Sequence, residues 1–272
     1  MASSSITVLK YQALGNDYLF LDASKFPQPS QDWIVKICDR HYGIGSDGLL
    51  YGKSSAYGDF SVQIFNPDGS VAEMSGNGTR IFAYAVCESG YVPLNAEFSI
   101  NTGTKSIKAI VRSSREVSVD MGCPSFTDAN IPHFNEGSST ISIDGQNFTY
   151  YPASIGNPHC VIFHDATTTD VLHFGPQLEN NPLFPNKTNV QFAKILDRGN
   201  IDIKIWERGA GYTLASGSSA CAVFAVAHTL DLCEDNVEIH MPGGALSLQM
   251  NSTGHIVQTG PVEHIATCTV TK

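Results

Sequence analysis

The sequence has little positive charge, and what it has is not clustered. Its 272 residues include 16 Lys and Arg against 26 Asp and Glu, for a formal net charge of −10. Proteins that bind nucleic acid need a basic patch to neutralise phosphates. We therefore expect no nucleic-acid partner. An anionic substrate would have to be bound by a local basic side chain or by backbone N–H groups.

The sequence also lacks the patterns of exported and membrane-spanning proteins. Met1–Val8 contains no basic region followed by an apolar run, so we expect no signal peptide. The longest apolar helical runs are about a dozen residues, too short to cross a bilayer. These absences favour a cytoplasmic protein without a membrane partner.

Cysteine pairs of the metal-binding kind are missing too. The seven cysteines are scattered, odd in number, and form no C-x-x-C pair. Neither a disulfide framework nor a zinc ribbon is indicated. We expect no metal.

Two segments that are present look like copies of each other. Leu214–Val226 echoes Glu73–Val86, and each places Ser-Gly before an almost wholly apolar stretch. Ser75 and Ser216 hold matching places at these two predicted helix starts. Serine is an ordinary N-cap, but the free N–H groups of a helix start also bind carboxylates. The duplication favours a site that holds one small anion from two sides.

The apolar stretches also predict the fold. Arg80–Cys87 and Ala220–Leu230 are apolar on almost every face, and such helices are buried. Short strands are expected around both of them, and Gln31–Arg40 is predicted as a further helix. We expect an α+β protein of two pseudo-symmetric domains, each a curved mixed or antiparallel β-sheet wrapped around a buried central helix. The boundary is expected near Gly122-Cys123-Pro124, with the active site in the cleft between the domains.

The expected strands follow from alternating apolar residues and turn signals. They are Ile6–Leu9, Tyr18–Leu21, Phe60–Phe65, Phe98–Ile100, Ile107–Val111, Val117–Met121, Ile141–Ile143, Phe148–Ile155, His159–Phe163, Asn189–Ile195, Ile201–Glu207, Val237–His240, Leu246–Met250 and His255–Thr259.

Three further motifs have chemical content. Gly43–Gly48 matches G-x-G-x-x-G, but it follows a predicted helix and leads into a strand-like run, the reverse of a dinucleotide site. Glu207–Gly211 offers an Arg fork suited to a carboxylate, or an ordinary surface ion pair. Gly156–His159 places an amide and an imidazole at a strand start, where the imidazole is a base or a structural residue.

Taken together, the motifs resemble the diaminopimelate epimerase family over nearly the whole chain. They are Gly15–Asp17, Asp39–Gly45, Asn66–Ser70, Ala72–Gly78, Gly156–His159, Thr188–Val190, Glu207–Gly211 and Met241–Gly244. The resemblance implies a cofactor-independent enzyme with two pseudo-symmetric halves. It places residues 1–122 with 261–272 in one half and residues 123–260 in the other. It implies an amino-acid substrate, diaminopimelate, and leaves a homodimer as the candidate assembly.

The resemblance also implies the roles of individual residues. The family uses two cysteines, one on each face of the substrate Cα, and these positions are Ser75 and Ser216 here. His159 and Glu207 would help the two groups ionise. Backbone N–H groups would hold the reacting α-carboxylate, and amide and guanidinium side chains would grip the distal end of the substrate. The first set is Gly76, Asn77, Gly217 and Ser218; the second is Asn66, Asn157, Asn189 and Arg208, with Asn16 nearby.

The departures from the family pattern concern the chemistry. Both expected cysteines are serines, and a hydroxyl ionises far less readily than a thiol. We therefore expect an inactive or very weak enzyme, through either a deliberate Cys-to-Ser replacement or a natural change. Tyr212 stands where relatives often have Glu, and Ser219 where Gly is common. Two alternatives stay open: a racemase for another amino acid, such as histidine or glutamate, and a silent amino-acid-binding homologue.

Overall fold

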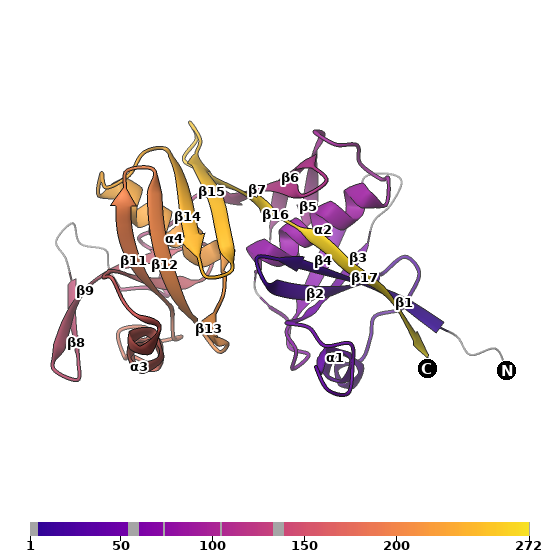
Figure 1. The fold of residues 1–272 in the computed structure, drawn as a ribbon, viewed down its shortest axis with the longest axis horizontal. Helices are drawn as coiled ribbons and strands as arrows, with labels where there is room; N and C mark the ends of the chain where they lie inside the picture. The colour runs from indigo at the N-terminus through magenta and orange to yellow at the C-terminus, as the bar shows by residue number, and fades with distance from the viewer. Residues whose placement is uncertain (1–4, 54–59, 73, 104, 133–138, 272) are drawn as a thin grey trace. The chain divides into compact units, whose positions relative to one another are not determined.

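A computed structural model of the chain describes residues 5–53, 60–72, 74–103, 105–132 and 139–271. It divides into two compact units, Met1–Val119 with Gly260–Lys272 and Asp120–Thr259 (Figure 1). Residues 1–4 and 272 of the expected halves lie outside the described part, as does Glu73 of the expected repeat. Each unit is described by itself below.

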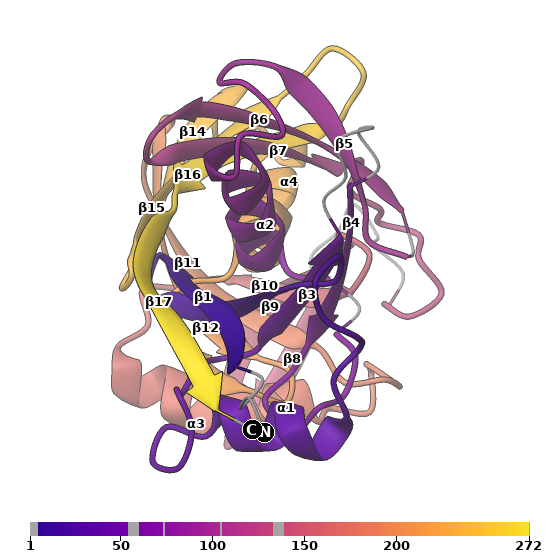
Figure 2. The same cartoon turned by 90° about the vertical axis from the view of Figure 1, so that its right-hand side faces the viewer.

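The first unit is a mixed sheet around one helix. Its elements are β1 (Ser5–Ala13), β2 (Asn16–Asp22), α1 (Gln31–Cys38), β3 (Leu49–Lys53), β4 (Phe60–Phe65), α2 (Gly76–Glu88), β5 (Glu97–Asn101), β6 (Ser106–Ser113), β7 (Glu116–Gly122) and β17 (Glu263–Thr271). Strands β1 to β4 and β6 all contact α2, and Figure 2 shows the strands surrounding this helix.

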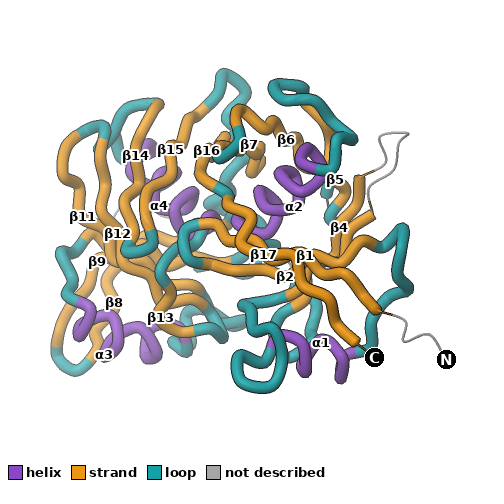
Figure 3. Tube along the Cα trace, turned by 45° about the vertical axis from the view of Figure 1, so that its right-hand side comes forward, coloured by secondary structure: helices purple, strands orange, loops and turns teal. Residues whose placement is uncertain are grey.

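The second unit has the same plan. Its elements are β8 (Ser139–Ile143), β9 (Gln146–Ser154), β10 (Pro158–Phe163), α3 (Thr168–Glu179), β11 (Asn189–Asp197), β12 (Asn200–Glu207), β13 (Gly211–Thr213), α4 (Gly217–Thr229), β14 (Asn236–Met241), β15 (Gly244–Met250) and β16 (Ile256–Pro261). Helix α4 contacts β9, β10, β11, β14 and β15. In both units the other helix, α1 or α3, lies outside the strands (Figure 3).

The order and direction of strand pairing are the same in the two units. From β17 through β1 to β7, successive pairs run antiparallel, antiparallel, parallel, antiparallel, parallel, antiparallel and antiparallel. From β8 through β9, β10, β11, β12, β14 and β15 to β16, the directions repeat in the same order. The predicted α+β class with two pseudo-symmetric sheet-around-helix units is confirmed, and β17 supplies the first strand of the first unit.

Both central helices are buried as their composition predicts. Ile81, Phe82 and Ala83 of α2 are fully buried, as are Ala222 and Val223 of α4. Burying a Phe or Ile side chain stabilises the fold by about 1.5–3 kcal/mol. The Ser-Gly starts of the two helices are therefore the polar ends of two largely apolar helices.

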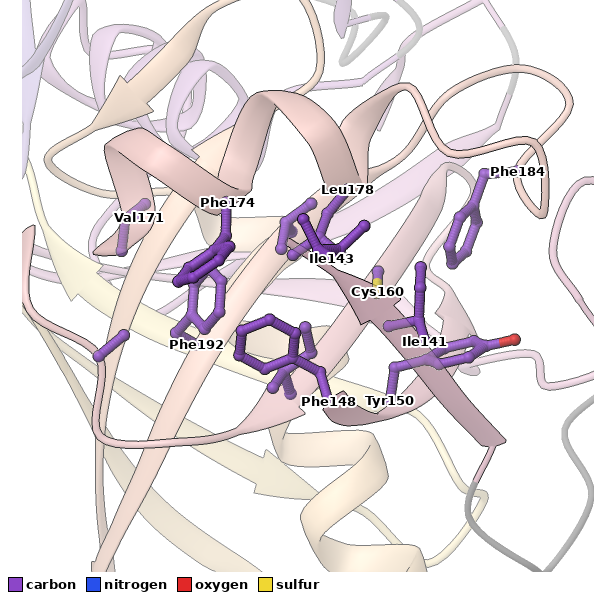
Figure 4. Close-up of a cluster of buried hydrophobic side chains, with 13 residues drawn as sticks. Ile141, Ile143, Phe148, Tyr150, Cys160, Val171, Phe174, Leu178, Phe184 and Phe192 are labelled. Atoms are coloured by element: carbon purple, nitrogen blue, oxygen red, sulfur yellow. The ribbon is translucent and has the colours of Figure 1, made fainter. Parts of the chain in front are cut away.

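Helix α3 was not predicted from the sequence. Thr167 and Asp170 form a reciprocal capping box at its start, and Pro176 lies inside it. Val171 and Leu178 are fully buried in a cluster with the phenylalanines of β9 and β11, where the rings of Phe148 and Phe174 lie 5.0 Å apart (Figure 4). Helix α3 therefore covers the second sheet, as α1 covers the first.

In the part of the chain that the structure describes, no helix has both the length and the apolar character needed to span a bilayer. All seven cysteines are free.

Candidate functional site

Ser75 is the N-cap of α2, and its hydroxyl oxygen accepts two hydrogen bonds. Gly78 N–H donates over 3.0 Å, which is the ordinary capping bond. The Tyr18 hydroxyl donates over 3.2 Å from the start of β2. Ser75 Oγ is therefore held in one position at the end of a buried helix.

Ser216 takes the same backbone conformation at the start of α4. Its φ and ψ are −143° and 120°, against −142° and 115° for Ser75. Among the described residues of α4, none donates a capping hydrogen bond to Ser216 Oγ. The two helix starts therefore match in backbone and differ in how the hydroxyl is held.

The expected carboxylate-binding N–H groups belong to the first turns of these helices. Gly76, Asn77 and Gly217 are buried, and Ser218 is half-buried. First-turn N–H groups have no acceptor within their helix, and the helix dipole adds positive potential there. Each helix start is thus chemically suited to a carboxylate.

Asn16 and Asn77 are brought together beside Ser75. Asn77 Nδ2 donates to Asn16 Oδ1 over 3.1 Å, and Asn16 Nδ2 donates to Asp47 over 3.0 Å. Arg40 bridges Asp47 and Asp17 at 2.6 and 2.8 Å. Burial opposes ionisation of Asp17, but hydrogen bonds from Arg40 and Lys10 hold its pKa below the ordinary value. The protein itself holds the Asn16 amide at both ends, which fixes this side of the site.

Asn66 lies in the turn after β4 and makes hydrogen bonds within that turn. Its Nδ2 donates to Ser70 Oγ over 2.9 Å, and its carbonyl accepts from Gly69 N–H. Within the described residues no hydrogen bond joins Asn66 to Asn16 or to Ser75. The structure therefore shows a turn role for Asn66.

His159 is fully buried on β10, between two amides. Its Nε2 lies 2.9 Å from Asn157 Oδ1, and its Nδ1 lies 3.0 Å from Gln191 Nε2, which also donates to Ser219 Oγ. Because an amide nitrogen only donates, Nδ1 accepts and the proton is on Nε2. Burial, and then the positive charge of Arg208, lower the pKa of His159 to about 3. The ring is a neutral imidazole whose tautomer is set by Gln191.

This burial predicts a pH dependence of stability. In the unfolded chain the imidazole gains a proton below its ordinary pKa of 6.5, whereas in the folded chain it stays neutral down to about 3. The contribution is therefore fully present above pH 6.5 and is lost as the pH falls towards 3. Between pH 7 and pH 4 the loss is about 3 kcal/mol. Urea unfolding of the protein and of His159→Gln should be measured at several pH values. The difference between their free energies of unfolding should shrink by this amount from pH 7 to pH 4. Parallel curves would contradict a neutral His159.

Asn189 and Arg208 meet at the ends of β11 and β12. Asn189 Oδ1 accepts from the backbone N–H of Arg208 over 3.0 Å, and Asn189 Nδ2 donates to the Pro158 carbonyl over 2.9 Å. The parallel register of β10 and β11 sets His159 opposite Asn189. Asn157, Asn189 and Arg208 are thus brought into one group, with Glu207 at the end of β12 directly before Arg208.

Glu179 and Gln191 are positioning groups that the sequence did not reveal, and Ser219, which the sequence shows only as a departure, is the hydrogen-bond partner of Gln191. Glu179, at the end of α3, accepts from Trp206 Nε1 over 2.7 Å and from Gly209 N–H over 3.1 Å. It therefore holds the turn that carries Arg208. Tyr212, a departure from the family pattern, packs with Trp206 against the apolar cluster under α3.

Comparison with known proteins identifies relatives of this chain. The sequence profile of the family described as diaminopimelate epimerase matches residues 8–127 and 151–265. The protein named diaminopimelate epimerase 2 of Nostoc sp. is 46% identical over 266 residues, covering 94% of this chain and 93% of that relative. This chain belongs to the diaminopimelate epimerase family. The predicted family is therefore confirmed.

Other relatives extend the comparison. A diaminopimelate epimerase of Desulfitobacterium hafniense is 37% identical, with 95% of each chain covered. The solved structure of a hydroxyproline epimerase from Agrobacterium vitis, with bound trans-4-hydroxy-L-proline, has a TM-score of 0.73 at 13% identity, covering 99% of this chain and 92% of that one. At that identity the likeness shows the fold. Enzymes of the diaminopimelate epimerase family are isomerases, which sets the class of chemistry for this site.

Proposed function

We propose that this chain is a diaminopimelate epimerase scaffold that interconverts the LL and meso forms by proton transfer at Cα when thiols stand at positions 75 and 216. The observation that carries the proposal is the matched backbone of Ser75 and Ser216, each at the start of a buried helix in units with the same strand order. One group would remove the α-proton and the other would deliver a proton to the opposite face.

We propose the following binding roles. First-turn N–H groups of both helices would hold the α-carboxylate and stabilise charge that develops on it as Cα loses its proton. The group of Asn157, Asn189 and Arg208 would hold the distal amino-acid end, because it combines amides with a guanidinium fork. Asn66 belongs to this set by resemblance. Residues 1–122 with 261–272 and residues 123–260 would be the two halves, with the site in the cleft between them.

His159 and Glu207 would help the two groups at positions 75 and 216 to ionise. A neutral imidazole bonded to two amides can relay hydrogen bonds, but it must release one amide before it can accept a further proton. In the chain as it stands, serine at both positions leaves the proton transfer very slow, because a hydroxyl needs a much stronger base than a thiol.

The test is solvent exchange. Ser75→Cys with Ser216→Cys should incorporate deuterium at Cα of diaminopimelate in heavy water, with inversion. A panel including histidine and glutamate should show far less exchange. No exchange with diaminopimelate would refute the proposal, and strong preference for an amino acid without a distal carboxylate would favour a different racemase.

We also propose that the protein is a homodimer, that it is cytoplasmic, and that it has no nucleic-acid partner. Strand β17 supports the homodimer: it pairs with β1 and exposes Thr267, Thr269 and Thr271. An exposed strand with few charged side chains can pair with a second chain. Analytical ultracentrifugation should show twice the mass of the chain.

A further inference from the structure

The internal repeat extends to the strands that flank the helix starts. Gly15-Asn16 opens β2 and Gly156-Asn157 precedes β10, and the two glycines have φ values of 82° and 89°. Strands β2 and β10 hold the same place in the two pairing orders. Counting two residues on from each Asn, Tyr18 matches His159.

Tyr18 contacts the group at position 75 directly. Its hydroxyl donates to Ser75 Oγ over 3.2 Å, and the residue is 7% exposed. Its ring lies against Gly48, where a Cβ would approach Tyr18 Cε1 to 2.7 Å. Gly48, the last glycine of the G-x-G-x-x-G segment, therefore leaves the space that the ring needs. The tyrosine is fixed by packing as well as by its hydrogen bond.

The two matched positions are used differently in the described structure. Tyr18 reaches the N-cap hydroxyl of its own unit, whereas the ring nitrogens of His159 bond to Asn157 and Gln191. Ser75 Oγ is the acceptor of a phenol and of the Gly78 amide. A negative charge at position 75 would receive two hydrogen bonds from fixed donors, the arrangement that stabilises an oxyanion or thiolate.

We propose that Tyr18 is a positioning residue for proton transfer at position 75: it orients the reacting group and stabilises its anion by a hydrogen bond. The role rests on the proposed epimerase function. When the group at position 75 gives its proton to the substrate carbanion, the anion left behind accepts from Tyr18 O–H and Gly78 N–H. When it takes the α-proton, it becomes neutral and keeps the same partners. Tyr18 retains its own proton in both directions.

The test measures the acidity of a thiol at position 75 without substrate. In Ser75→Cys, alkylation by iodoacetamide is followed against pH, and peptide mass spectrometry isolates position 75 from the seven natural cysteines. Tyr18→Phe, which keeps the ring, should raise the pKa of this thiol by about 1, since one charge-assisted hydrogen bond is lost. 3-Fluorotyrosine at position 18, a stronger donor, should lower it.

A matched control is Tyr11→Phe. Tyr11 is a buried tyrosine of the same unit that donates to Glu88, at the opposite end of α2 from Ser75. That change should leave the acidity at position 75 unaltered, and Tyr18→Phe should leave the acidity of a thiol at position 216 unaltered. An unchanged pKa at position 75 with both Tyr18 replacements would overturn the proposal. Failure of the epimerase function would appear separately, as absent deuterium exchange with an intact dependence of the thiol on Tyr18.

Discussion

Replacing Ser75 and Ser216 together by cysteine is expected to raise kcat/KM for LL-diaminopimelate by about 10⁴-fold over the chain as it stands. A thiol has an ordinary pKa near ~8.5 and can be ionised at a helix start, whereas a serine hydroxyl stays protonated at every ordinary pH. The two positions share the backbone geometry of N-cap residues, so the change adds acidity without moving the chain.

Stopped-assay kinetics of both stereoisomers would measure this gain. The matched control is Ser46→Cys. Ser46 is a buried serine of the first unit, and its hydroxyl contacts Cys38 and the Gly48 carbonyl. Ser46→Cys should give no gain. Equal rates for the serine and cysteine forms would show that the groups at positions 75 and 216 do not transfer the proton.

The second large effect concerns Glu179, whose replacement by leucine should lower the free energy of unfolding by about 3 kcal/mol. The change leaves Trp206 Nε1 and Gly209 N–H without their acceptor near the apolar cluster. Because Gly209 follows Arg208, the turn that carries the guanidinium should loosen. The Kd of the serine form for diaminopimelate should rise about tenfold, which is the effect of losing about 1.4 kcal/mol of binding free energy.

Urea unfolding and calorimetry measure the two parts of this prediction. Glu179→Gln keeps one acceptor oxygen and should fall between the protein and Glu179→Leu in both. A stable Glu179→Leu protein with unchanged affinity would show that Glu179 does not hold the turn that carries Arg208.

Most of the fold could be predicted because the sequence repeats its own plan. The two apolar helices that begin after Ser75 and Ser216 showed the symmetry. Most of the strands lie where alternating apolar residues predicted them. Helix α3 was missed because Gly175 and Pro176 interrupt its apolar spacing. The duplication could have supplied it, since α1 occupies the matching place between β2 and β3.

In the candidate site, only the residues that lie within sequence motifs could be predicted. Asn189 bonds to the Pro158 carbonyl and to the backbone N–H of Arg208. The binding roles of Asn157, Asn189 and Arg208 stay predictions. The sequence around Gln191 and Glu179 does not indicate their roles. Each bonds to a residue more than 25 positions away, and only the fold shows which residue that is. Tyr18 was assigned to a strand, and its contact with Ser75, 57 positions away, follows from how β2 packs beside the start of α2.

Deuterium exchange by the two single-thiol variants shows whether positions 75 and 216 act on opposite faces of one carbon. With one thiol, a proton removed from Cα can return only from the same face, so exchange should occur without inversion. Ser75→Cys should label one of the LL and meso forms at the reacting carbon, and Ser216→Cys should label the other. Labelling of the same stereoisomer by both variants would contradict two acid–base positions on opposite faces of one carbon.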